Sequence, residues 1–152
     1  MLVNNKIKVA GLVASVSKRF GVKVVKYANV GNHLHLVVRL PAKGMTSKIF
    51  YGKWIRLLTS RVAFEIGGGK KGEPLKDGEG NRAKFWDAVP FSRVIHDRRG
   101  WKTIDRYVLK NELEAQGLPK VVAIAMAAKL YDSNRALDLP DWSTQSELHE
   151  TA

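Results

Sequence analysis

The sequence contains no cysteine, and this absence excludes two classes of structure. Disulfide bonds cannot form and a thiolate zinc site is impossible, so any metal must be held by His, Asn or carboxylate side chains. Long apolar runs are missing as well: the longest, Val121 to Ala128, is far shorter than the roughly 20 residues that cross a bilayer. The N-terminus also lacks the long apolar core of a signal peptide. We therefore expect a soluble, cytoplasmic protein with no membrane partner.

Acidic residues are absent from the first 64 positions, and Glu65 is the first. Twelve of the 26 Lys and Arg residues precede it, and the remaining fourteen are matched by all fourteen acids, so the whole net charge of +12 lies in the first 64 residues. Such segregation indicates a polyanionic partner, nucleic acid before a membrane surface. The alternative is a basic protein whose charge serves solubility alone.

Local patterns predict a helix followed by a hairpin. Apolar residues at near-helical spacing predict a helix that ends near Gly21; they are Ile7, Val9, Ala10, Val13, Ala14 and Val16. The β-branched and aromatic stretch from Val22 to Val30 predicts a strand. Turn residues from Asn29 to Asn32 then join it to a second strand, which ends at Leu40, as an antiparallel hairpin.

A second helix is expected to begin with Thr46 or Ser47 as its cap and to run to about Val62. Its expected buried stripe is Met45, Ile49, Ile55, Leu58 and Val62. Six glycines and Pro74 between Gly67 and Asn81 predict a mobile loop. Strand-like composition from Lys84 to Ile95, broken at Pro90, predicts one further strand.

Two more helices are expected, one from a cap at Thr103 to about Ala115 and one from Lys120 to Tyr131. With 152 residues the chain can bury about two-thirds of its unfolded surface in one domain. We expect an α+β fold, a ferredoxin-like antiparallel sheet with helices packed on one face, over residues 1–118. Residues 119–152 then form a C-terminal helix and an acidic tail.

The strand from Gly31 to Leu40 divides its side chains between two faces, because side chains alternate along a strand. One face is apolar and holds Leu34, Leu36, Val38 and Leu40; the other holds His33, His35, Val37 and Arg39. The imidazoles, about 6 to 7 Å apart along the strand, can lean toward one metal ion or phosphate. Taken alone, the pair is equally compatible with a partly exposed polar face.

The helix expected after Thr103 carries a phenol and an amide one turn apart. At about 100° per residue, Tyr107 and Asn111 fall in the apolar sector that also holds Ile104, Val108, Ala115 and Leu118. A half-buried tyrosine is ordinary, but a buried amide must be satisfied by a partner. A metal or a phosphate would satisfy it.

These residues resemble the single-strand DNA transposases of the HUH endonuclease superfamily, which include the REP-associated tyrosine transposases. The family's histidine motif is matched by Asn32-His33-Leu34-His35-Leu36, and its tyrosine motif by Tyr107-Val108-Leu109-Lys110-Asn111. The stretch from Phe85 to Ile95 also resembles the family. The family's fold begins with a strand, for which only Met1 to Asn5 is present here, so we expect a copy shortened at its N-terminus.

The resemblance implies a metal-dependent transposase that nicks and rejoins single-stranded or hairpin DNA through a phosphotyrosine link. His33, His35 and Asn111 would bind Mg²⁺ or Mn²⁺, and Tyr107 would be the nucleophile. The two motifs can meet within one chain or across a homodimer. The expected DNA-binding residues are Arg39, Lys48, Lys53, Arg56, Arg98, Arg99, Arg106 and Lys110. Two alternatives stay open: a nucleic-acid-binding copy without cleavage, and a replication or mobilisation nickase with the same chemistry.

Overall fold

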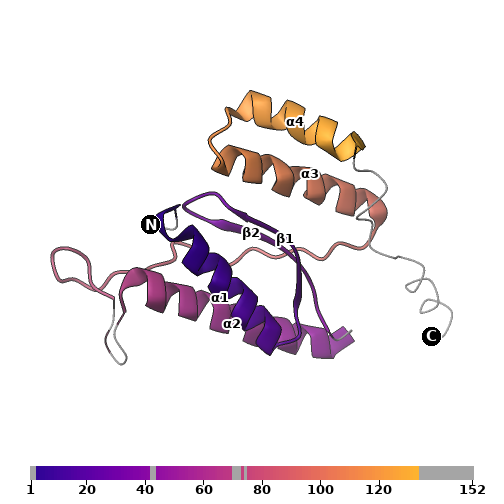
Figure 1. Ribbon diagram of the computed structural model, residues 1–152. Helices are drawn as coiled ribbons and strands as arrows, with labels where there is room; N and C mark the ends of the chain where they lie inside the picture. Colours follow the sequence, from indigo (N-terminus) through magenta and orange to yellow (C-terminus); the bar gives the residue numbers. More distant parts are fainter. Residues whose placement is uncertain (1–2, 42–43, 70–72, 74, 134–152) are drawn as a thin grey trace. The chain divides into compact units, whose positions relative to one another are not determined.

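The computed structural model describes residues 3–41, 44–69, 73 and 75–133. The chain divides into two compact units, Met1–Arg93 and Val94–Ala152, so the division falls inside the segment 1–118 expected to form one domain. The acidic tail from residue 134 lies outside the described residues. Figure 1 shows the elements in chain order. They are a 3-10 turn (Val3–Asn5), α1 (Lys6–Arg19), β1 (Lys23–Asn29), β2 (Leu34–Arg39), α2 (Gly44–Gly67), α3 (Arg98–Ala115) and α4 (Lys120–Ser133).

The sheet of the first unit is the predicted antiparallel hairpin of β1 and β2. The ladder pairs Lys23 with Arg39 at its open end and Asn29 with Leu34 beside the turn. The register shifts between Val24 and Lys26, which makes Val25 a β-bulge, an extra residue without a partner in β2. The α+β class is therefore confirmed, with helices packed against an antiparallel sheet.

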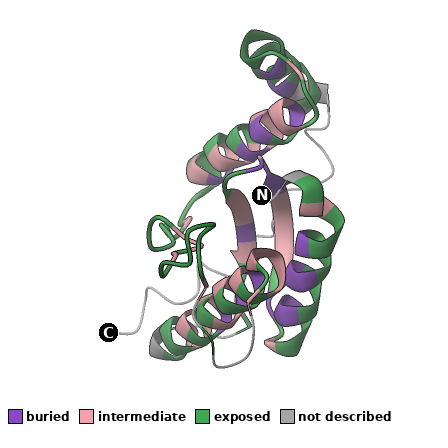
Figure 2. Ribbon diagram, turned by 90° about the vertical axis from the view of Figure 1, so that its left-hand side faces the viewer, coloured by how far each residue is buried: buried purple, intermediate pink, exposed green. Residues whose placement is uncertain are grey.

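Helices α1 and α2 cover the apolar face of the hairpin. Their buried residues recur at helical spacing, and Figure 2 shows them alternating with exposed positions; they are Val9, Leu12, Val13 and Val16 on α1 and Trp54, Leu58 and Val62 on α2. The face of β2 predicted to be apolar packs against this cluster through Leu34, Leu36 and Val38, together with Leu40 just beyond the strand. The indole N–H of Trp54 donates to Ser17 Oγ at 3.1 Å, which ties the two helices together.

Some predicted details of these helices are wrong. Helix α2 begins at Gly44, ahead of the expected cap, and continues past Val62 to Gly67. Ile49 is 54% exposed, and Trp54, which the stripe omitted, is fully buried in its place. Ile7 is likewise exposed at the start of α1, because the buried sector begins at Val9. Met45 lies outside the described side chains.

The further strand expected from Lys84 to Ile95 is wrong, because this segment docks through aromatic side chains instead of pairing its backbone. The indole N–H of Trp86 donates to Thr59 O on α2 at 3.0 Å. Phe85 packs edge-on against Trp86, and both contact the core of the first unit. The segment beyond is exposed, and Pro90 has no N–H to give to a ladder.

Part of the segment expected to be a mobile loop forms a closed turn. Lys76 and Arg82 form a bridge, and Asp77 Oδ1 accepts the N–H groups of Glu79 and Asn81 at 3.0 and 2.8 Å. Residues 70–72 and 74 lie outside the described residues. The turn is local and positions none of the candidate site residues.

The second unit is a pair of helices, α3 and α4. Helix α3 begins at Arg98 because Asp97 is its cap, accepting the Gly100 N–H at 2.6 Å; the cap expected at Thr103 is wrong. The helix ends at Ala115 as predicted. Leu113 of α3 packs against Ala123 and Ala127 of α4. Within the described part of the chain, no helix has the length and apolar character needed to cross a membrane.

Candidate functional site

The turn between β1 and β2 sets the position of the first histidine. Asn29 is buried, and its Oδ1 accepts the Gly31 N–H at 3.0 Å. Gly31 has a φ of 103°, in the left-handed region that favours glycine. The Val30 N–H donates to His33 O at 3.2 Å and closes the turn. His33 therefore lies at the turn, immediately before β2, and His35 lies within the strand.

The two imidazoles converge. Their Nε2 atoms are 2.9 Å apart, and the rings meet nearly at right angles, with centroids 4.6 Å apart. Asn32 Oδ1 lies 2.6 Å from His33 Nδ1. Because a carbonyl oxygen only accepts, His33 Nδ1–H donates to it, and the lone pair on Nε2 of neutral His33 faces His35. His33 is exposed and His35 half-buried, so a solute can reach the pair.

The two nitrogens lie at hydrogen-bond distance, and the same separation is compatible with a shared cation. In an octahedral shell with metal–ligand distances of about 2.0 to 2.1 Å, neighbouring ligand atoms lie about 2.9 Å apart. The observed Nε2–Nε2 distance is 2.9 Å. Nitrogen donors favour Mn²⁺ over Mg²⁺, since Mg²⁺ prefers oxygen ligands. Over the described residues no group of three or more His, Asp or Glu side chains could hold a metal ion, so the two histidines stand as a pair without a third ligand of these types.

The predicted nucleophile and the third predicted ligand lie on α3, in the second unit. Asn111 is buried, and its Nδ2 donates to Tyr107 O at 2.7 Å, one turn back in its own helix. The bond uses only Nδ2 of Asn111 and does not involve its Oδ1, which is the atom of an asparagine that binds metals. Tyr107 is 44% exposed, so its predicted inward position is wrong. The histidines belong to the first unit and Tyr107 and Asn111 to the second, so the convergence of the two motifs stays a prediction.

The phenol of Tyr107 has a cation beside it. Lys110 Nζ lies 5.5 Å from the centroid of the Tyr107 ring. The same ammonium group is 3.1 Å from Glu114 Oε2, which holds it on this side of α3. An ammonium group at this distance over a tyrosine ring makes a cation–π contact.

The predicted DNA-binding residues are distributed over both units. In the first unit Arg39 ends β2, and Lys48, Lys53 and Arg56 lie along α2, all of them exposed. In the second, Arg98, Arg99 and Arg106 of α3 are exposed and Lys110 is half-buried. Arg98 and Arg99 lie in the first helical turn, where the helix dipole disfavours positive charge, so helix stability does not account for them.

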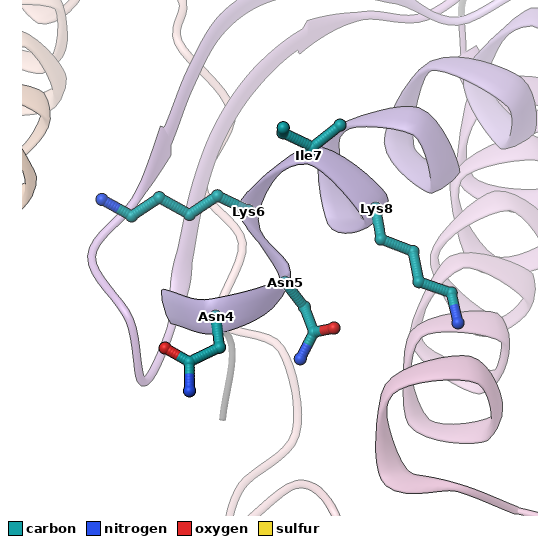
Figure 3. A pocket seen from close by; sticks show the side chains of 5 residues that line it. All are labelled: Asn4, Asn5, Lys6, Ile7 and Lys8. Carbon is teal, nitrogen blue, oxygen red and sulfur yellow. The ribbon is translucent and has the colours of Figure 1, made fainter.

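A shallow hollow at the start of α1 brings no polar groups together. It is lined by Asn4, Asn5, Lys6, Ile7 and Lys8. Figure 3 shows the two lysine side chains directed away from each other. The Lys8 ammonium donates to Glu65 O of α2 at 2.9 Å, and Ile7 is exposed. The arrangement anchors α1 to α2 and offers no cluster of donors to a ligand.

Three residues of the hairpin have positions that sequence reasoning did not predict. Asn32 was part of the histidine motif, but its bond to His33 required the geometry of the turn. Lys23 and Lys26 come to the face of the hairpin that holds His35, because the ladder pairs them with Arg39 and Val37. Regular alternation places two residues three apart on opposite faces, so only the bulge could have signalled this.

Comparison of the chain with models of protein families, with curated proteins and with solved structures found no match.

Proposed function

We propose that this chain is a metal-dependent transposase that nicks and rejoins single-stranded DNA through a covalent phosphotyrosine intermediate. The observation that carries the proposal is the histidine pair, whose Nε2 atoms lie 2.9 Å apart beside a turn. Asn32 fixes the ring of His33 so that a lone pair is presented. The acid-free first 64 residues support a nucleic acid as the substrate.

His33 and His35 would hold Mn²⁺ or Mg²⁺, with Asn111 Oδ1 as the third protein ligand. The ion, when bound, polarises a phosphodiester oxygen and offsets its negative charge. Outer partners of metal-bound histidines orient the ring, and Asn32 has this role for His33. Water and the DNA would supply the remaining ligands.

Tyr107 is the proposed nucleophile. Its phenol oxygen forms a bond to phosphorus while the bond from phosphorus to the leaving deoxyribose oxygen breaks. The phenol proton is released, and the leaving oxygen takes one up. A hydroxyl of a second DNA end later attacks the phosphotyrosine and displaces Tyr107. One ester replaces another in each step, so no ATP is consumed, and Lys110 provides a cation beside the developing phenolate.

A nicking assay tests the proposal. The chain is incubated with a labelled pool of random single-stranded oligonucleotides and Mn²⁺, and covalent complexes are detected by gel electrophoresis in denaturant. Tyr107→Phe is expected to abolish the complex without loss of DNA affinity, because it removes only a hydroxyl. Tyr51→Phe, on half-buried Tyr51 of α2, is the matched control and is expected to keep it. A complex that persists in Tyr107→Phe assigns the nucleophile elsewhere.

The same assay decides whether the two motifs meet in one chain or across a homodimer. Tyr107→Phe and His35→Ala are each expected to be inactive alone. Activity of an equal mixture would mean that one chain supplies the histidines and another the tyrosine. An inactive mixture, with both variants folded, would assign both motifs to the same chain.

A second candidate function is nucleic-acid binding without cleavage. It is favoured by the amide of Asn111, which is buried and bonded within its own helix. The absence of any covalent complex from the unmutated chain, with retained DNA affinity, would support it. A replication or mobilisation nickase shares the first candidate's chemistry and differs only in the DNA that it recognises.

A further inference from the structure

The hairpin face that holds His35 bears charges of one sign only. This histidine face is defined by alternate residues of β2 and their partners in β1; they are His35, Val37 and Arg39 with Ala28, Lys26 and Lys23. Lys23 and Arg39 are exposed and Lys26 is half-buried, whereas Val37 and Ala28 in the middle of this face are buried. The opposite face is the apolar one that packs against α1 and α2.

The bulge at Val25 creates this distribution. In a regular strand Lys23 and Lys26 would point to opposite faces, since they are three residues apart. The extra residue shifts the ladder, so Lys23 pairs with Arg39 and Lys26 with Val37. Without the shift, Lys26 would pair with Leu36, on the apolar face. The bulge therefore brings a second lysine to the histidine face and keeps it out of the core.

The pair at the open end of the hairpin is unfavourable by itself. Lys23 and Arg39 are directly opposite each other in the ladder, where Cβ atoms are about 4.5 to 5.5 Å apart and like charges repel. Neither forms an ion pair within the described part of the chain. A bound anion would turn this repulsion into joint attraction. Arg offers a planar fork to a phosphate, and Lys adds a point charge.

We propose that Lys23 and Arg39 form a phosphate clamp, which holds one backbone phosphate of the single strand that reaches the histidine pair. The clamp rests on the proposed function for the identity of its ligand, single-stranded DNA. Arg39 is four residues from His35 on the same face, about 13 Å along the strand. At the stacked spacing of 3.4 Å this distance corresponds to about four phosphates, which is the smallest separation between the clamp and the cleaved bond.

The variant Lys23→Glu tests the clamp because folding and binding are expected to move in opposite directions. A glutamate facing Arg39 replaces repulsion with attraction, so thermal unfolding of the free protein is expected at a higher temperature. The affinity for a labelled single-stranded thymidine oligonucleotide, measured by anisotropy in EDTA over a range of salt, is expected to fall. The slope of log K against log salt is expected to become shallower by about 0.7, the value for one phosphate of a single strand.

Lys18→Glu is the matched control, since Lys18 is an exposed lysine of the same acid-free segment but lies on α1. It makes the same change in net charge and is expected to leave the salt slope unchanged. Arg39→Gln is expected to reproduce the slope change of Lys23→Glu, and the double variant to add little, because both side chains hold one phosphate.

An unchanged slope in Lys23→Glu, or a change equal to that in Lys18→Glu, would overturn the clamp. A lower unfolding temperature for Lys23→Glu would also overturn it, because the pair would then be structural. No metal or cleavage enters these measurements. Absence of a covalent complex from the unmutated chain in the nicking assay therefore refutes the transposase, and an unchanged salt slope in Lys23→Glu refutes the clamp, independently of each other.

Discussion

The hydrogen bond from His33 to Asn32 gives the most direct test of the proposed metal site. Asn32→Leu removes the acceptor while keeping a side chain of similar size, so the His33 ring loses the group that fixes its orientation and its proton on Nδ1. Asn32→Asp keeps an acceptor and makes it negative. The backbone tolerates both changes, since none of the non-glycine residues in the described part of the chain has a positive φ.

The size of the effect follows from the exposure of Asn32. Removing the outer partner of a metal-bound histidine lowers metal affinity by about 10- to 100-fold. Asn32 is exposed, so water can replace part of its bond, and the lower end applies. We expect Asn32→Leu to bind Mn²⁺ about tenfold more weakly, a loss of about 1.4 kcal/mol. Asn32→Asp is expected to bind at least as tightly as the unmutated chain.

Calorimetric titration with Mn²⁺ measures this order of affinities. Asn4→Leu is the control, because Asn4 is an exposed asparagine of the same unit that is not part of the hairpin. It is expected to bind Mn²⁺ like the unmutated chain. Equal affinity of Asn32→Leu and the unmutated chain would refute the role of Asn32. Equal affinity of His35→Ala and the unmutated chain would refute the metal site itself.

Two further predictions concern the first unit. Ser17→Ala leaves the indole N–H of buried Trp54 without its acceptor. It is expected to lower the free energy of unfolding, measured by urea titration, by about 1 to 3 kcal/mol. The control Ser15→Ala, at an exposed site of the same helix, is expected to be neutral or slightly stabilising. The Tyr27 hydroxyl is buried without a hydrogen-bond partner among the described residues, and this desolvation raises the pKa of Tyr27, an effect that nearby Asn29 opposes only in part. As the pH rises, the unfolded chain therefore loses the Tyr27 proton before the folded chain does. The free energy of unfolding falls as the pH rises from the ordinary pKa of 10.0 toward the raised pKa of folded Tyr27. Tyr27→Phe is expected to reduce this fall in unfolding measurements from about pH 9 to 11.

The elements that could be predicted from the sequence are those set by local patterns. Helix α1 and the hairpin follow from periodicities that change from 3.6 to 2 at Gly21. The segment from Lys84 to Ile95 has the composition of a strand, but composition does not say whether the backbone finds a partner. Here the segment is held by its side chains: the Trp86 indole N–H donates to the Thr59 carbonyl, 27 residues earlier in the chain.

The candidate site was predictable to the same extent. The two-residue spacing predicted that His33 and His35 could approach each other, and this prediction needed no tertiary information, although His33 lies in the turn before β2 and not in the strand. Helical periodicity placed both Tyr107 and Asn111 inside, yet only Asn111 is buried, since Tyr107 lies at the edge of the apolar sector. The partner of Asn111 proved to be a carbonyl one turn back, an option that an amide in a helix always has.

The charges of the hairpin are not arranged as stability alone would favour. An antiparallel hairpin is stabilised by opposite charges on facing residues, and the chain has fourteen acidic residues, none of them before Glu65. Its hairpin instead places Lys23 opposite Arg39, and a bulge brings Lys26 to the same face. The facing pair costs folding free energy, and it makes the open end of the hairpin attractive to a polyanion. The charge pattern of the hairpin is thus better explained by binding than by folding.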